Sequence, residues 1–293
     1  MIINSEGKFA DNYYLIDAMV MGLPKYLSVY VIENKGMRLI VDVGTTMKTR
    51  KIIRKLKALN LFPIHKIVLT HSHWDHASGI SKFISLMGDT DTEVLASENA
   101  IENLKHPEII LEGFDGLTDY HPYEGVTPLK EGDIIDLNGM DLEIVNFFGH
   151  TMDSIAILDR ANRTIFVGDA IISKLDQYAF NPPIVPPDFH ENKLLKTYEK
   201  LRDMENDLNS VSLAHFGVWG DPHFTQILNE MEDLYFKTKN LLIEWYNENP
   251  SNEYITKKYC KTLIPNSKFW DEKIFTFIID MMIKGLKSSG YIK

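Results

Sequence analysis

Three histidines and one aspartate within six residues form the strongest chemical signal in this sequence. The stretch reads His71-Ser-His73-Trp-Asp75-His76 and directly follows the apolar run Ile67-Val68-Leu69, which predicts a buried strand. Two imidazoles separated by one residue can converge on one cation, while the adjacent Asp and His can turn toward a second. Imidazole together with carboxylate suits Zn²⁺ best, and Fe and Mn are possible.

Three more potential ligands lie directly after predicted strands. The stretches 142–147, 164–167 and 210–214 are apolar and lead into His150, Asp169 and His215. Ligands cluster at the carboxyl ends of strands in open α/β sheets, so four strand ends would bring seven ligands together. We therefore predict a dinuclear metal centre. Five histidines have no such neighbours, and we expect them to be ordinary polar core residues: His65, His106, His121, His190 and His223.

The seven grouped residues resemble, in order and approximate spacing, the metal-ligand motifs of the metallo-β-lactamase superfamily. Asp42-Val-Gly44 also resembles the early Asp-x-Gly element of that superfamily. The resemblance covers about residues 14–217. It implies an α+β fold, the four-layer αβ/βα sandwich, in which two β-sheets lie face to face with helices outside and a dinuclear metal site at one edge.

The resemblance also implies a role for each ligand. His71, His73 and His150 would bind the first metal ion, Asp75, His76 and His215 would bind the second, and Asp169 would bridge the two. Two departures from the family pattern are visible. Phe148 stands where many relatives have Pro, and Met152-Asp153 replaces a frequent Pro-Gly. Neither removes a ligand, so only the local turn is in question.

The implied chemistry is hydrolysis by a metal-bridging hydroxide, because two nearby divalent cations acidify a shared water and polarise a carbonyl or phosphoryl oxygen. We assign proton handling to Asp75 or a metal-bound water, which makes Asp75 the predicted catalytic residue. True zinc β-lactamases of the superfamily tend to have Cys at the position of Asp169, so antibiotic hydrolysis is not expected. The expected substrate is a small, partly apolar ester, thioester or lactone.

The segment between Asp169 and Glu191 is predicted to form an apolar substrate rim. It contains four prolines and three aromatic residues, which favours a stiff connection over the metals. The apolar loop 19–26 would form the facing wall. The predicted rim residues are Tyr26, Tyr178 and Phe180. Acyl-homoserine lactonases, which resemble this ligand set, have a Tyr where this chain has Ile172, and Tyr178 is the nearest phenol. Thioester hydrolases of the glyoxalase II type share the histidine string, but no basic cluster suited to glutathione is evident.

Two other activities stay open. A metal-dependent ribonuclease or phosphodiesterase is one, because the ending 282–293 resembles the helix-to-wing sequence of RNA-processing members. The formal net charge of −10 argues against a polyanion partner, and all of it lies in residues 1–220, since residues 221–293 carry ten acidic and ten basic residues. A mononuclear iron persulfide dioxygenase is the other. A non-catalytic binding protein is disfavoured because all seven ligands are present.

The elements that must position these residues follow from periodicity. Strands at 26–32 and 38–41 are joined by a turn at Asn34-Lys35-Gly36, and helices are predicted at 49–59 and 78–87. After about residue 220 the apolar residues recur at helical spacing. We therefore predict a catalytic domain at 1–220 and a helical C-terminal extension at 221–293. Its last helix, near 274–286, is apolar over much of its circumference and must be buried against the main body or a second subunit, which makes a homodimer possible.

The remaining composition limits the class of protein. With Cys260 as its single cysteine, the chain has neither an internal disulfide framework nor a multi-thiolate zinc site. No apolar run approaches the roughly 18 residues that span a bilayer, and no secretion signal is evident at the N-terminus. We therefore expect a cytoplasmic protein without membrane contact that acts on a small-molecule substrate, with nucleic acid as an unlikely partner.

Overall fold

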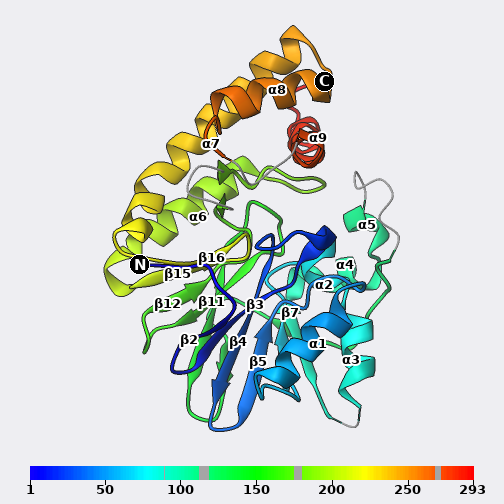
Figure 1. The fold of residues 1–293 in the computed structure, drawn as a ribbon, viewed down its shortest axis with the longest axis vertical. Coiled ribbons are helices and arrows are strands. Elements are labelled where there is room, and N and C mark those ends of the chain that lie inside the picture. Colours follow the sequence, from blue (N-terminus) through cyan, green and yellow to red (C-terminus); the bar gives the residue numbers. More distant parts are fainter. Residues whose placement is uncertain (89, 112–118, 175–179, 268–271) are drawn as a thin grey trace.

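The computed structural model describes residues 1–88, 90–111, 119–174, 180–267 and 272–293. Two seven-stranded sheets lie face to face (Figure 1). The first, in spatial order, contains β2 (Gly7–Ala10), β3 (Tyr13–Asp17), β4 (Ser28–Asn34), β5 (Met37–Val41), β6 (Lys66–Val68), β7 (Glu93–Ser97) and β8 (Val126–Leu129). The second contains β1 (Ile2–Ile3), β16 (Gly217–Gly220), β15 (Ser210–Leu213), β12 (Thr164–Phe166), β11 (Ile155–Asp159), β10 (Asp141–Asn146) and β9 (Ile134–Asp136).

Helices cover the outer face of each sheet. The first sheet is covered by α1 (Thr49–Ala58), α2 (Trp74–Ala77), α3 (Ile80–Met87), α4 (Ile101–Lys105) and α5 (Glu108–Leu111). The second is covered by α6 (Glu191–Asp203) and α7 (His223–Glu248), with α8 (Asn252–Thr262) and α9 (Glu272–Ser288) beyond them. Short 3₁₀ turns η1 (Val20–Gly22), η2 (Glu98–Ala100) and η3 (Glu205–Asp207) and a hairpin of β13 (Ser173–Lys174) and β14 (Phe180–Asn181) complete the described elements.

Side chains that alternate between the two faces of each strand build the layers of the sandwich. In β4, Tyr30 and Ile32 face the opposite sheet, whereas Val29 and Val31 face the helices. Successive side chains of a strand point to opposite faces, so a strand that is apolar at every position must be covered on both sides. The three resulting apolar clusters fill three interfaces between four layers. The predicted αβ/βα sandwich with a helical C-terminal region is therefore confirmed.

The predicted hairpin between β4 and β5 is present. Asn34 pairs with Met37, and the two loop residues Lys35 and Gly36 both have positive φ, 47° and 84°. This is the mirror-image turn that matches the twist of an antiparallel pair. The strand begins at Ser28 rather than at the predicted Tyr26, because the Tyr26 carbonyl accepts a hydrogen bond from His215 instead of joining the sheet.

Several elements were not predicted from periodicity. The first sheet starts with the short strands β2 and β3, and β16 is a four-residue strand between the edge strand β1 and β15. The polar helices α6 and α8 have long charged surfaces that weaken the apolar repeat. The predicted helix at 78–87 begins at Ile80, because the preceding residues form the separate turn of α2 that carries Asp75 and His76.

The C-terminal helices share a core with the main body. Tyr235 and Trp245 of α7 and Ile279 of α9 belong to the same apolar cluster as Ile165 and Val211 of the second sheet. The prediction that the last helix would be buried against the main body is met by α9. The division into domains at residue 220 stays a prediction. Among the described residues, no helix combines the length and apolar character needed to cross a bilayer.

Replacing Ile279 by Ala should destabilise the whole fold. Its side chain is fully buried in the shared core, and such large-to-small changes typically lower the free energy of unfolding by about 2–5 kcal/mol. Urea unfolding followed by circular dichroism should show one transition at a lower midpoint. Lys287→Ala, at an exposed position of the same helix, is the control. An unchanged midpoint would contradict the shared core.

Candidate metal centre

Four strand ends meet at one edge of the sandwich. β12 and β15 are parallel, and β10 runs in the same direction as β12 because both are antiparallel to β11. The residues following these three strands include His150, Asp169 and His215. β6 of the facing sheet leads into the loop of His71. At this edge the Ile155 amide donates to the Thr70 carbonyl at 2.8 Å, which ties the two sheets together.

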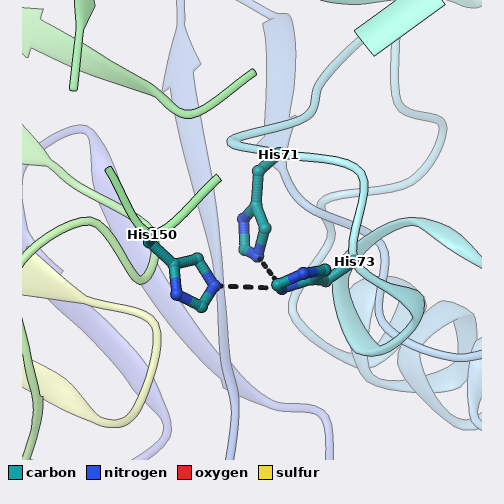
Figure 2. A group of neighbouring side chains, drawn as sticks. All are labelled: His71, His73 and His150. Carbon is teal, nitrogen blue, oxygen red and sulfur yellow. Dashed lines mark hydrogen bonds between the residues drawn. The ribbon is translucent and has the colours of Figure 1, made fainter. Parts of the chain in front are cut away.

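Three histidines form the first group of neighbouring side chains (Figure 2). Nδ1 of His73 lies 3.1 Å from Nε2 of His71 and 3.0 Å from Nε2 of His150. All three side chains are at least 97% buried, with exposed fractions of 1% for His71, 3% for His73 and 2% for His150. Three imidazole nitrogens thus converge on one point from two different sheets.

A second group contains Asp75, His76 and His215, and Asp169 lies between the two groups. Oδ2 of Asp169 is 3.1 Å from Nε2 of His215, 3.4 Å from Nε2 of His76 and 3.8 Å from Nε2 of His150. Nε2 of His215 is also 3.5 Å from Oδ2 of Asp75. The carboxylate of Asp169 therefore contacts histidines of both groups. The structure brings all seven predicted residues together.

Each of four imidazoles is held in place through the nitrogen that points away from the centre. Nδ1 of His150 faces the Pro183 carbonyl at 3.1 Å, and Nδ1 of His215 faces the Tyr26 carbonyl at 2.5 Å. Nδ1 of His71 faces Oγ1 of Thr70 at 3.0 Å. Acceptors at Nδ1 favour the tautomer that leaves Nε2 available for a cation, a common arrangement around metal-binding histidines.

Asp42 fixes the fourth imidazole. Its carboxylate lies 2.8 Å from Nδ1 of His76 and also accepts hydrogen bonds from the amide and hydroxyl of Thr70. Since the Thr70 hydroxyl donates to Asp42, it can accept from His71. One buried carboxylate therefore orients two histidines, one in each group. The residue follows β5 and has a positive φ of 62°, a conformation that Asp tolerates better than most residues.

The loop of His150 is held by its neighbours on both sides. The amide nitrogen of Leu194 lies 2.3 Å from where a Cβ on Gly149 would be, and Gly149 has a φ of +134°, so only Gly fits this approach of α6. Thr197 of α6 donates to the Phe148 carbonyl. Asp153 accepts from the Ser72 amide at 3.1 Å, which links this loop to the His71 loop. The family departures at 148 and 152–153 thus leave the loop well supported.

The two groups differ in charge. Burial lowers the pKa of His71, His73 and His150, that of His73 to about 3, so these imidazoles are neutral. Burial would also lower the pKa of His76 and His215, but nearby carboxylates outweigh it, raising the pKa of His76 well above its usual value and that of His215 to about 10. The same contacts outweigh burial at Asp75 and Asp169 and lower their pKa.

These residues fit a pair of divalent cations. Oδ1 of Asp169 is buried without a hydrogen-bond partner among the described residues, and so is Nε2 of His76. Native structures rarely leave such atoms unsatisfied, and a cation would satisfy both. The nitrogen spacings of the histidine group are also close to the roughly 3.3 Å between ligands of tetrahedral zinc with Zn–N bonds of about 2.0–2.1 Å.

A cleft opens above the candidate ligands. Tyr26 lines it, as predicted for the rim, and its ring contacts that of His215 with 4.8 Å between ring centres. Burial raises the pKa of the Tyr26 phenol, with Asp75 and Asp169 adding to the effect, so the phenol keeps its proton. Tyr178 lies outside the described residues. Of Phe180 the structure describes the backbone, in β14.

Four other lining residues, Asn181, Pro182, Pro183 and Val185, come from the segment that the sequence predicted as the rim. Trp74 lies within the histidine motif but was not predicted to line the cleft. The remaining lining comes from α9, whose apolar circumference was the available signal: Phe277, Ile278, Met281 and Met282.

The five histidines outside the centre take other roles than predicted. His106, His121 and His190 are exposed rather than core residues. His65 is half-buried, and its Nδ1 accepts a hydrogen bond from the Arg38 amide. His223 begins α7 and contacts the ring of Trp219.

The sequence model of the metallo-beta-lactamase superfamily matches residues 24–215, a span that contains both groups of ligands. The chain belongs to this superfamily. A crystal structure of a metallo-beta-lactamase family protein from Thermus thermophilus is similar over 95% of this chain and 94% of its own, with a TM-score of 0.62 and 18% identity. That likeness concerns the fold and includes the C-terminal helices.

Curated relatives have several activities. A ribonuclease Z of Clostridium botulinum (strain Eklund 17B / Type B) is 32% identical over 141 residues, covering 44% of this chain and 42% of the relative. The acyl-coenzyme A thioesterase MBLAC2 of Gallus gallus is 29% identical over 161 residues, covering 49% of this chain and 57% of the relative. The matches thus span about half the length of these relatives, and both names describe hydrolases.

The charge on His215 makes a testable prediction for the metal-stripped protein. A group whose pKa is raised on folding stabilises the fold fully below its unfolded pKa of about 6.5, and this contribution is lost as the pH rises through the folded value of about 10. The difference in unfolding free energy between wild type and His215→Gln, measured by urea titration, should therefore shrink between pH 7 and pH 10. A difference independent of pH would contradict a protonated His215.

Proposed function

We propose that this protein is a metal-dependent hydrolase of a small ester, thioester or lactone. The observation that carries the proposal is the convergence of seven ligand-type side chains at the floor of a largely apolar cleft. In this proposal, one ion is held by His71, His73 and His150, the other by Asp75, His76 and His215, and Asp169 bridges them. Zinc is the preferred ion for this ligand set, with iron and manganese as alternatives.

Two bound divalent cations would supply an acidified water and a Lewis acid for the carbonyl oxygen. The protein itself holds the metal-binding side chains in position. Asp42 and the carbonyls of Tyr26 and Pro183 hold three imidazoles by their outer nitrogens, so the inner nitrogens stay aimed at the centre when the cleft fills. The buried lining excludes bulk water from the floor, which strengthens every charge interaction there.

Asp75 is the proposed proton acceptor. It reaches the cleft, and the histidines beside it lower the pKa of its carboxyl, so it is ionised at neutral pH. In hydrolysis, the attacking water loses a proton and the leaving group gains one. The Asp75 carboxylate can take the first proton and deliver it to the leaving oxygen or sulfur. Tyr26, protonated and at the rim, can donate a hydrogen bond to the substrate.

A carbonyl substrate suits the cleft better than a phosphodiester. The described residues that line it include neither Lys nor Arg. Phosphate groups in proteins are usually held by such cations or by helix N-termini. The main body is also acidic. The likeness to ribonuclease Z nevertheless favours metal-dependent RNA cleavage as the second candidate function.

Removing the metal tests the function directly. Dialysis against a chelator should abolish hydrolysis, and two equivalents of Zn²⁺ per chain should restore it, because each histidine group holds one ion. The activity panel contains an ester, a thioester, a lactone, a bis-nitrophenyl phosphodiester and a structured RNA. Salt-sensitive cleavage of RNA alone would support the second candidate. One iron per chain together with oxygen uptake from a persulfide would overturn the hydrolase proposal.

Replacing Asp75 by Asn should reduce kcat by at least about 10³-fold, since the amide keeps the shape but cannot accept the proton. The measurement combines steady-state kinetics with metal content and melting temperature. Asp141→Asn, an exposed carboxylate in β10, is the matched control and should retain full activity. A folded, metal-loaded Asp75→Asn enzyme that turns over normally would reject the role of Asp75.

A further inference from the structure

The last helix forms the wall of the cleft opposite the metal ligands. Phe277, Ile278, Met281 and Met282 include pairs at the three- and four-residue spacing that places side chains on one face of a helix. Met281 and Met282 are 5% and 2% exposed although they line an open cleft. Polar groups lie elsewhere on α9, where Asp280 pairs with Lys284 and accepts from Asn252.

α9 is firmly seated on both halves of the sandwich. Met281 packs into the apolar cluster of the first sheet, whereas Ile279 and Met282 pack into that of the second. At Gly285 the helix approaches the backbone of Ile184 and Val185 so closely that a Cβ would lie about 3.0–3.1 Å from it. The helix and the 182–185 segment therefore form one continuous apolar wall, and that wall is part of the fold.

The chemistry of the cleft is divided between its two ends. The floor holds the carboxylates and imidazoles of the metal centre, and the wall holds thioether, aromatic and branched aliphatic groups. Asn181 also lines the cleft, and its Oδ1 accepts a hydrogen bond from the Tyr259 hydroxyl at 2.8 Å. A ligand that matches both ends has a carbonyl at one end and an uncharged hydrocarbon at the other.

We propose that the cleft is an acyl-chain chamber: the substrate is a carbonyl compound with an uncharged alkyl chain, and the chain lies against α9 and residues 182–185. This inference rests on the proposed function and adds its substrate class. Methionine side chains are flexible and polarisable, so Met281 and Met282 can fit chains of different length. The leaving group can be an alcohol, a thiol or the hydroxyl of an opened lactone, since the chamber holds the acyl side.

Chain length is the first test. Burying one methylene contributes enough to raise kcat/KM about fourfold. For straight-chain 4-nitrophenyl esters from acetyl to decanoyl, kcat/KM should therefore increase about fourfold with each added carbon until the chamber is full. The same acyl chains are also tested as N-acetylcysteamine thioesters and as γ-lactones with alkyl tails. The class that is hydrolysed fastest identifies the leaving group. A flat series in all three classes would overturn the chamber.

Variants of α9 separate substrate contact from structure. Ile278→Trp should lower kcat/KM for the octanoyl ester at least tenfold while changing the acetyl ester less than threefold, because the larger ring fills the chamber but leaves the metal centre intact. Met281→Gln, which replaces the thioether by an amide of similar size, should reduce the increase in kcat/KM per added methylene. It is the second test variant if Ile278→Trp does not fold. Lys287→Gln, exposed near the end of the same helix, is the control. Equal losses on short and long esters would reject the proposal.

Binding distinguishes failure of this inference from failure of the hydrolase proposal. 2-Alkanones of four to twelve carbons have the carbonyl and the chain but no hydrolysable bond. Calorimetry with the metal-loaded protein should show affinity that increases with chain length and is lost in Ile278→Trp. If esters, thioesters and lactones are all inert but this series holds, the hydrolase proposal fails and the chamber stands. If the protein hydrolyses these substrates at rates that do not depend on chain length, and does not bind the alkanones, the hydrolase proposal stands and the chamber is rejected.

Discussion

Burying many ionisable groups at one point is the constraint on which the rest of this structure depends. Five imidazoles and two carboxylates share one desolvated edge of the sandwich, each at most 8% exposed. Unpaired buried charge is costly, so each group needs a partner of opposite charge or a hydrogen bond. The arrangement satisfies this by dividing the histidines into a neutral group and a group charged against Asp75 and Asp169. The outer acceptors, above all Asp42, stabilise both groups.

That constraint explains why the site needs two sheets. Strand ends of one sheet cannot surround a point, because its strands lie side by side in a surface. Here β6 and its loop approach from the first sheet, and β10, β12 and β15 approach from the second. The hydrogen bonds that cross between them, such as Ile155 to Thr70 and Ser72 to Asp153, hold the two sets of ligands in register. The fold and the site are therefore specified together.

How far the sequence predicts this protein depends on how local each signal is. The candidate ligands were predictable because each lies within ten residues of the end of a short apolar strand, so the pattern is local in the sequence. The hairpin at Lys35-Gly36 was predictable for the same reason. The wall formed by α9 was not, because an apolar helix can be buried against any apolar surface and the sequence does not show which one. Asp153 looked like a departure from the family pattern, and its link to Ser72 joins residues far apart in the chain.

The order of the elements along the chain also has a consequence in time. All seven candidate ligand residues precede position 216, whereas the wall of the cleft is completed by α9, which begins at Glu272. A ribosome that adds roughly 5–20 residues per second needs about 4–15 s to synthesise the residues from His215 to the end of α9 at Ser288. The side chains that gather at the floor of the cleft are therefore synthesised several seconds before the helix that completes its wall.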